Sequence, residues 1–274
     1  MISLKQIIDI ITFIIIGIIQ GITEIFPVSS SGHLALCYYY FNVSNEIQLD
    51  LTIFLHLASS IALFIFFKNK ILELIKGTFL YLFKKDKTQK ENFMLVIYIL
   101  IASIPITIVG FFIKPLIENL FSNIKFILIG FMITAILLLV NSFIKEQNKS
   151  SYDFKNTLIT GLIQCFSVFP AISRSGVTLL GSKIAKLDHQ KGKEFTFLLL
   201  IPISFGSSLL SIFDVIDNKI AINENIFLYL ISMIVAFVFT LISLRLFFYK
   251  SKKIKIYVYS IYLILLSLIN IILI

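Results

Sequence analysis

Six long apolar runs, separated by short polar connections, make up most of this chain. Each run is close to the roughly 20 residues that an α-helix needs to cross a bilayer. None of the connections is long enough to fold by itself. The pattern predicts an all-α polytopic membrane bundle that crosses the bilayer at residues 51–67, 93–113, 121–144, 195–213, 226–249 and 254–274.

Two further apolar segments are each broken by a proline and by a serine-rich turn that contains glycine. One extends from Gly17 to His33 and the other from Gly161 to Gly176. They are copies of each other, because adding 144 to Gly17, Gln20, Ser29, Ser31 and Gly32 gives Gly161, Gln164, Ser173, Ser175 and Gly176. Paired, interrupted segments in the two halves of a membrane chain indicate a binding site near the bilayer midplane.

Lysine is unevenly distributed among the connections, and this predicts which of them face the cytoplasm. Lysine clusters in the connections at 68–92, 145–155, 183–193 and 250–255. The connections at 41–50 and 214–226 are mainly acidic. With the lysine-rich connections inside, the three full spans of each half run in opposite senses.

The same distribution separates two topologies. If both broken segments were spanning helices kinked at proline, the chain would have eight spans and the lysines of 68–92 would lie outside. The lysine distribution argues against this and favours two re-entrant hairpins, the first entered from outside and the second from inside. The prediction is one membrane domain built as an inverted-topology repeat, with residues 1–144 and 145–274 as its halves.

The composition excludes a soluble protein. Hydrophobic residues make up 58% of the 274 residues, charged residues make up 14%, and the mean hydropathy is +0.97. A net charge of +9 would suggest nucleic acid in a soluble protein, but here it follows from the topology, so we expect no nucleic-acid partner. Cys37 and Cys165 stand alone in apolar runs and are predicted to be buried thiols, neither a disulfide nor a metal pair.

Glu24 is the most informative single residue. A carboxylate within the membrane costs about 2.5–3.5 kcal/mol on insertion scales and is a functional candidate by default. Gln20 lies four residues earlier, on the same face of a helix. The pair could supply two oxygen ligands to a cation, or a base with its hydrogen-bonding partner, or a structural hydrogen bond between helices.

Arg174 is a second unusual charge, because it lies between two serines in the second turn. The planar guanidinium suits phosphate oxygens, although it could also pair with Glu24. The serines are natural N-caps, and a helix N-terminus attracts anions. His33, at the start of the helix predicted after the first turn, is an acid–base candidate. His56 and His189 stand outside the turns and rank lower.

At these residues the chain resembles the undecaprenyl-diphosphate phosphatase family, the integral membrane enzymes linked to bacitracin resistance. The resemblance covers essentially the whole chain and includes a stretch from Glu194 to Leu199. Its two long motifs stand here as Gln20, Glu24, Pro27, Ser29, Ser30, Gly32 and His33, and as Pro170, Ala171, Ser173, Arg174, Ser175 and Gly176.

The chain departs from the family pattern at two positions. Gln20 takes the variant form of a position that is often Glu, which would weaken any metal held there. Ala171 replaces a glycine, so we expect no positive φ at that position.

The resemblance implies hydrolysis of a C55 polyprenyl diphosphate to the monophosphate at the outer side of the bacterial cytoplasmic membrane. It implies a divalent cation, Mg²⁺ or Ca²⁺, held by Glu24 and Gln20. The nucleophile is either Ser30, assisted by His33 or Glu24, or a cation-activated water. Arg174 completes the expected catalytic set, and the substrate-binding residues would be Ser29, Ser31, Gly32, Ser173, Ser175 and Gly176.

A transporter is the main alternative, since inverted repeats with re-entrant hairpins are transporter architecture. Such a protein could move a polyprenyl phosphate across the bilayer, alone or in addition to hydrolysis. It would use Arg174 but would have less need of Ser30 and His33. The expected partners are the lipid substrate and the membrane, and a homodimer is left open.

Overall fold

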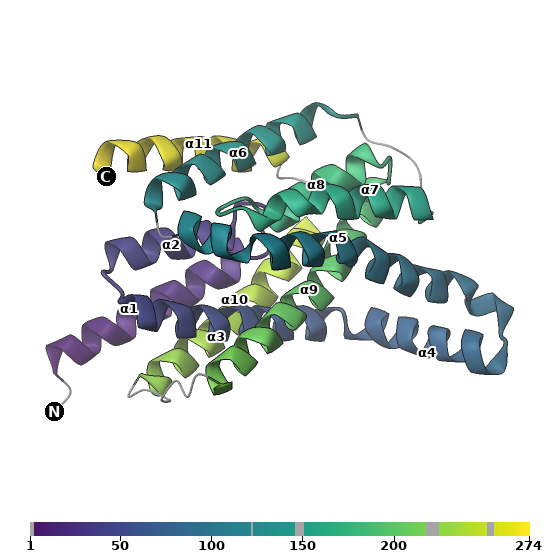
Figure 1. Cartoon of the computed structure of the whole chain (residues 1–274), viewed down its shortest axis with the longest axis horizontal. Coiled ribbons are helices and arrows are strands. Elements are labelled where there is room, and N and C mark those ends of the chain that lie inside the picture. The colour runs from purple at the N-terminus through teal and green to yellow at the C-terminus, as the bar shows by residue number, and fades with distance from the viewer. Residues whose placement is uncertain (1–2, 122, 146–150, 218–224, 251–254) are drawn as a thin grey trace.

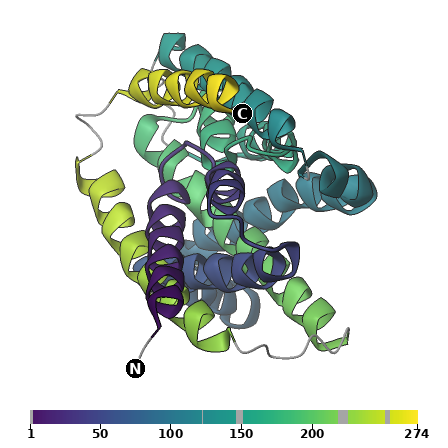
Figure 2. The ribbon, with the colours of Figure 1, turned by 90° about the vertical axis from the view of Figure 1, so that its left-hand side faces the viewer.

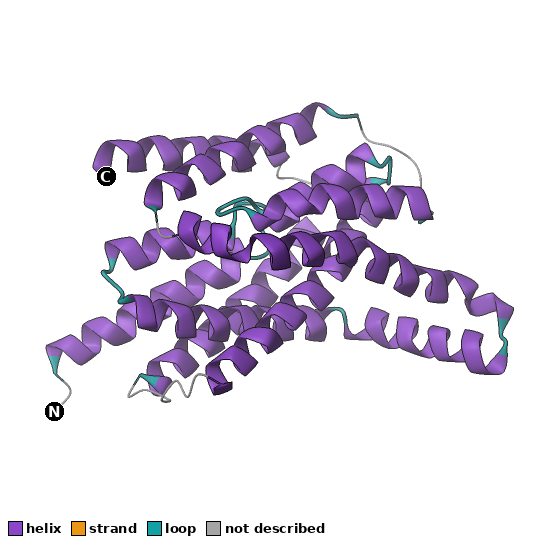
Figure 3. Cartoon of the chain, in the orientation of Figure 1, coloured by secondary structure: helices purple, strands orange, loops and turns teal. Residues whose placement is uncertain are grey.

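The protein is helical throughout the part of the chain that the structure describes. The computed structural model describes residues 3–121, 123–145, 151–217, 225–250 and 255–274, and these ranges contain no strand (Figures 1 and 3). Within these ranges, six segments are long and apolar enough to cross a membrane, namely Leu4–Thr23, Asn45–Phe66, Lys87–Ile117, Ile124–Phe143, Ile226–Tyr249 and Ile256–Leu273. The predicted all-α polytopic membrane bundle is confirmed.

The predicted spans fall on six helices, five of which are among the segments above; the exception is the helix at the predicted span 195–213. These are α3 (Asn45–Phe66), α5 (Lys90–Phe121), α6 (Ile124–Phe143), α9 (His189–Asp217), α10 (Ile226–Lys250) and α11 (Ile256–Leu273). Helix α4 (Lys68–Lys84) was not predicted, because it lies in a predicted connection; the short 3-10 helix η1 (Lys87–Gln89) follows it. Charged residues recur among the apolar residues of this helix, so no long apolar run marks α4.

The two broken segments form helix pairs that fold back on themselves. The first pair is α1 (Leu4–Thr23) with α2 (Ser30–Tyr40), and the second is α7 (Phe154–Gln164) with α8 (Arg174–Ile184). The helices of each pair pack against each other, which fits hairpins and not helices kinked at proline. Helices α2, α7 and α8 have 11 residues each, about 16 Å, which is too short to cross a bilayer. Helix α1 is long enough to do so.

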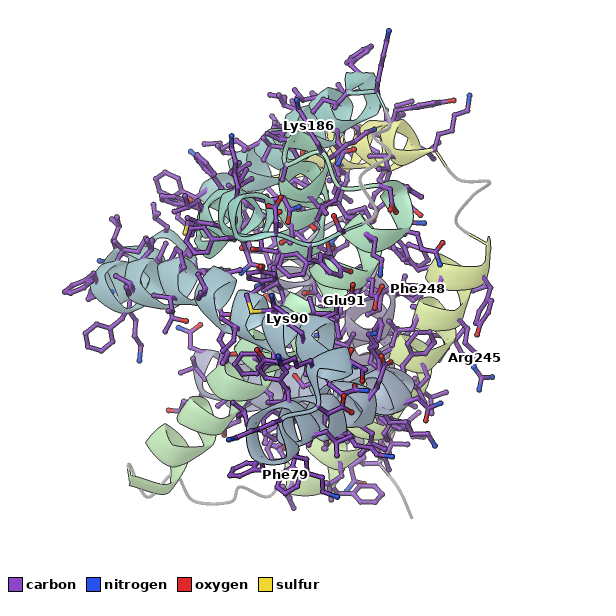
Figure 4. The ribbon with its side chains drawn as sticks, turned by 90° about the vertical axis from the view of Figure 1, so that its right-hand side faces the viewer. Phe79, Lys90, Glu91, Lys186, Arg245 and Phe248 are labelled. Carbon is purple, nitrogen blue, oxygen red and sulfur yellow. The ribbon has the colours of Figure 1, made fainter. Side chains whose placement is uncertain are left out.

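The two hairpins come from opposite ends of the bundle. The α1–α2 pair lies toward the left of Figure 1 and the α7–α8 pair toward the right. The corner between α4 and α5 is at the far right (Figure 1). Figure 2 looks onto the left-hand end, where α1 begins and α11 ends, and Figure 4 looks onto the opposite end. The corner between α4 and α5 belongs to the lysine-rich connection at 68–92. It lies at the end from which the second hairpin enters, as the predicted topology requires.

Cysteine labelling tests this topology in cells. In a background without the two native cysteines, probes at Asn45 and Asn218 should react from outside, and probes at Thr88 and Asn148 only after the membrane is opened. Asn45 and Thr88, both exposed, are decisive, since 148 and 218 lie outside the described residues. Labelling of Asn45 and Thr88 from the same side would rule out the re-entrant arrangement.

Each hairpin packs against a helix from the other half of the chain. Helix α1 packs on α10, and α7 packs on α5. Small residues permit the close approach: a Cβ on Gly17 would lie 2.7 Å from the Ser232 carbonyl oxygen, and one on Gly161 would overlap the backbone of Ala102. Gly17 and Gly161 are 144 residues apart. The two halves therefore interlock in one bundle, while the repeat boundary at residue 144 stays a prediction.

Candidate active site

The two serine turns meet at a cavity of about 230 Å³. Most residues that line it fall into pairs separated by 144 positions, one from each hairpin or from the helix that follows it. The pairs are Thr23 with Ser167, Glu24 with Val168, Ser29 with Ser173, Ser30 with Arg174, Ser31 with Ser175, and His56 with Leu200. The cavity is thus formed by equivalent positions of the two repeats.

Both turns use the same local hydrogen bonds. Ser29 caps α2 by accepting from the Gly32 N–H at 3.3 Å, and Ser173 caps α8 by accepting from the Gly176 N–H at 3.2 Å. The hydroxyl of each capping serine also lies 3.3 Å from the serine two residues later. Each cap places a helix N-terminus at the cavity, where its dipole favours an anion.

Two residues of the turns have backbone strain. Ser29 has a φ of 70° and Ala171 a φ of 55°, the region that favours glycine. The expectation that Ala171 has no positive φ is therefore wrong. Helix α6 holds Ala171 in place, because the Thr134 hydroxyl donates to the Ala171 carbonyl at 3.0 Å and accepts from the Ser173 N–H at 3.1 Å.

Gly130 on α6 allows the second turn to lie directly on that helix. A Cβ at this position would overlap the carbonyl oxygen of Pro170. We expect Gly130→Ala to lower the free energy of unfolding by about 1–3 kcal/mol, measured by thermal unfolding in detergent. Gly110→Ala is the matched control, since no atom lies within 4 Å of its added Cβ. Equal stability of the two variants would contradict this contact.

Glu24 and Ser30 form the closest polar contact in the cavity. The Ser30 hydroxyl donates to Glu24 Oε2 at 2.6 Å, and the Gln20 side-chain amide donates to the same oxygen at 3.1 Å. Glu24 is 9% exposed and Gln20 is fully buried. Glu24 therefore presents a desolvated carboxylate to a serine hydroxyl, an arrangement suited to removing the hydroxyl proton.

His33 lies behind the first turn and does not line the cavity. Its Nδ1 is 2.7 Å from the Ser29 carbonyl oxygen, and its Nε2 is 2.7 Å from the Tyr262 hydroxyl on α11. The two rings stack with their planes 9° apart. In this arrangement His33 holds the strained Ser29 turn in place, and its catalytic role stays a prediction.

His56 on α3 is the histidine that lines the cavity. Its Nδ1 lies 3.4 Å from Gln20 Nε2 and 3.6 Å from Glu24 Oε2. His56 lies outside both turns, and for that reason the sequence alone ranks it below His33 as a site residue. The signal that could have found it is the repeat offset, which carries on into α3 and α9.

Arg174 lines the opposite side of the cavity. Its Nη1 donates to Ser204 Oγ at 3.2 Å, while its Nε is buried without a hydrogen-bond partner. Among the described residues, no ion pair joins Arg174 to Glu24. The guanidinium therefore makes no direct contact with that carboxylate, and its unpartnered Nε is available to an anion.

The first turn offers oxygen ligands for a cation. Gln20 Oε1 is buried without a hydrogen-bond partner beside Glu24, which is the kind of orphaned atom that a ligand would satisfy. No group of three His, Cys, Asp or Glu side chains suited to a metal occurs in the part of the chain described here. The donor set fits Mg²⁺ or Ca²⁺, because Mg²⁺ is commonly held by one or two carboxylates together with substrate phosphates.

Comparison with known proteins identifies the family. The sequence profile described as "Bacitracin resistance protein BacA" matches residues 13–269. The chain belongs to the BacA family. A BacA relative from Thermosipho africanus, named undecaprenyl-diphosphatase, is 40% identical over 263 residues that cover 93% of this chain and 97% of the relative. The family resemblance carried by the two turn motifs is confirmed.

Two further BacA relatives have related names. The undecaprenyl-diphosphatase of Acholeplasma laidlawii is 39% identical over 251 residues, which cover 88% of this chain and 89% of the relative. Undecaprenyl-diphosphatase 2 of Bacillus thuringiensis is 30% identical over 271 residues, which cover 98% of this chain and 99% of the relative. The likeness to all three extends over most of the chain.

Proposed function

We infer that this chain is an undecaprenyl-diphosphatase of the bacterial cytoplasmic membrane. It hydrolyses undecaprenyl diphosphate to undecaprenyl phosphate and inorganic phosphate, which regenerates the lipid carrier for cell-wall synthesis. The observation that carries this inference is the 2.6 Å hydrogen bond between Ser30 and Glu24 in a cavity that also contains Arg174. A nucleophile, its base and an anion-binding cation are the groups that such a reaction needs.

We propose that Ser30 is the nucleophile. Its Oγ attacks the terminal phosphorus while its proton passes to Glu24, and the lipid monophosphate leaves. Glu24 passes this proton to the departing lipid monophosphate and is ionised again. Water then attacks the phosphoserine and gives a proton to Glu24, which returns it to the Ser30 Oγ as phosphate is released. Direct attack by water, with Glu24 as its base, is the alternative.

Arg174 and the two helix N-termini would stabilise the charge on the diphosphate. Arg174 offers a planar set of donors, and the capped turns offer backbone N–H groups and serine hydroxyls. The substrate-binding set is Ser29, Ser31, Gly32, Ser173, Ser175 and Gly176. Because these groups are preorganised by the caps and by α6, little reorganisation is needed when charge develops.

Glu24 and Gln20 are the residues that would hold a divalent cation. When bound, Mg²⁺ or Ca²⁺ would offset the negative charge of the transferring phosphoryl group. The Gln20 amide also donates to Glu24, whose carboxylate accepts from Ser30 through the same oxygen.

Phosphate release from undecaprenyl diphosphate by purified protein tests the proposal. We expect turnover that a chelator suppresses and that added Mg²⁺ or Ca²⁺ restores. If no phosphate is released even with added Mg²⁺ or Ca²⁺, the proposed reaction is contradicted. Turnover that is insensitive to chelator would contradict only the role of the cation and not the hydrolysis. The transporter alternative draws no support from the three relatives reported above, which all have hydrolase names.

A further inference from the structure

The two halves of the cavity have equivalent positions but different chemistry. In the first half, paired positions carry Glu24, Ser30 and His56. In the second half, the same positions carry Val168, Arg174 and Leu200. Every group that could move a proton from a nucleophile is therefore on one side. The other side offers the fixed cation of Arg174 and the hydroxyls of Ser167, Ser173 and Ser175, beside apolar side chains.

The apolar side of the cavity continues to the protein surface. Val168, Phe169, Ile172 and Leu200 all come from the second half, and Phe121 at the end of α5 completes the apolar lining. Phe169 and Phe121 line the cavity and are also 39% and 36% exposed. They thus extend the apolar lining from the buried site to the protein surface. No such apolar group of the first hairpin lines the cavity within the described residues.

We propose that the substrate binds in one orientation, with its lipid-linked phosphate at Arg174 and its first isoprenoid unit against Val168 and Phe169. The terminal phosphate then lies at Ser30 and Glu24. This inference rests on the proposed function and deepens it, because it assigns each phosphate to one of the two turns. A diphosphate suits such a site, since its two phosphoryl groups can each face one helix N-terminus.

The orientation follows from two physical requirements. The bond that is cleaved must lie at the nucleophile, so the terminal phosphorus must be near Ser30. The prenyl chain is apolar and gains free energy only where it leaves water for apolar surface, which the second half provides. The reverse orientation would place the chain beside Glu24 and His56 and would put the lipid-linked phosphate at the nucleophile.

Competitive binding of two compounds tests the assignment. Farnesyl phosphate has the lipid-linked phosphate and the prenyl chain, whereas methyl diphosphate has both phosphates and no prenyl chain. Inhibition constants are measured for each compound against the hydrolysis of undecaprenyl diphosphate. We expect Phe169→Ala to raise the inhibition constant of farnesyl phosphate on the order of tenfold and that of methyl diphosphate less than twofold. Val168→Thr, which is nearly isosteric, should act in the same direction.

Phe166→Ala is the matched control, because Phe166 is 60% exposed on the same segment and does not line the cavity. It should leave both inhibition constants within twofold. An equal effect of Phe166→Ala and Phe169→Ala, or an equal loss for both compounds in Phe169→Ala, would overturn the orientation.

A second measurement compares a substitution in each of the two turns. Binding of farnesyl phosphate to inactive protein, measured by calorimetry, should weaken at least tenfold in Arg174→Lys and less than threefold in Ser30→Ala. A larger loss in Ser30→Ala than in Arg174→Lys would place the lipid-linked phosphate at the first turn and refute the proposal. Either binding result bears on the orientation if the wild-type protein hydrolyses undecaprenyl diphosphate. Absence of that hydrolysis would instead reject the proposed function.

Discussion

Glu24→Gln should reduce hydrolysis of undecaprenyl diphosphate by about a hundredfold or more while the protein still folds and inserts. The amide has nearly the shape of the carboxylate but cannot accept the Ser30 proton, and general-base contributions are typically 10²–10⁴ in rate. Removing a buried carboxylate also eases membrane insertion, so stability should not fall. The measurements are kcat of the purified variant and its thermal unfolding midpoint.

Glu73→Gln is the control for this substitution. Its carboxylate on α4 is 52% exposed and forms an ion pair with Lys70, far along the chain from both turns. The control should keep wild-type kcat. Near-normal turnover in Glu24→Gln would contradict the assignment of Glu24 as the base. If Glu24→Gln fails to fold, kcat is measured in Glu24→Asp, which keeps the carboxylate.

Arg174→Lys should lower kcat/KM by about a hundredfold. The ammonium keeps the positive charge but loses the planar set of donors, and removal of one preorganised donor typically costs 10²–10³ in rate. Arg245→Lys is the matched control, because this second arginine is on α10 and points away from the bundle (Figure 4). If both variants kept full kcat/KM, Arg174 would contribute only a positive charge.

The spans could be predicted from the sequence because lipid imposes a simple rule. A helix that faces the hydrocarbon must be apolar along about 20 residues, so the runs at 93–113 and 226–249 coincide with α5 and α10. Helix α4 does not follow this rule, because charged residues interrupt its apolar positions, and it was therefore assigned to a connection. Helix α1 is longer than expected for the arm of a hairpin.

The meeting of the two turns could be predicted because the repeat offset and the opposite entry of the hairpins both require it. The fine geometry could not. Whether His33 or His56 faces the cavity depends on how α2 and α3 rotate, and Tyr262, which binds His33, is 229 residues away in the chain. The positive φ of Ala171 depends likewise on contacts with α6 that have no local signal.

In the proposed mechanism the two turns form a single site for the diphosphate. Paired substitutions Ser31→Cys and Ser175→Cys, in a background without Cys37 and Cys165, test it most directly, because both positions line the same cavity. A short bifunctional thiol reagent should link the pair within one chain, a polyprenyl diphosphate should slow the linking, and the linked protein should lose hydrolysis. Failure to link, or full hydrolysis by the linked protein, would contradict a site shared by the two turns.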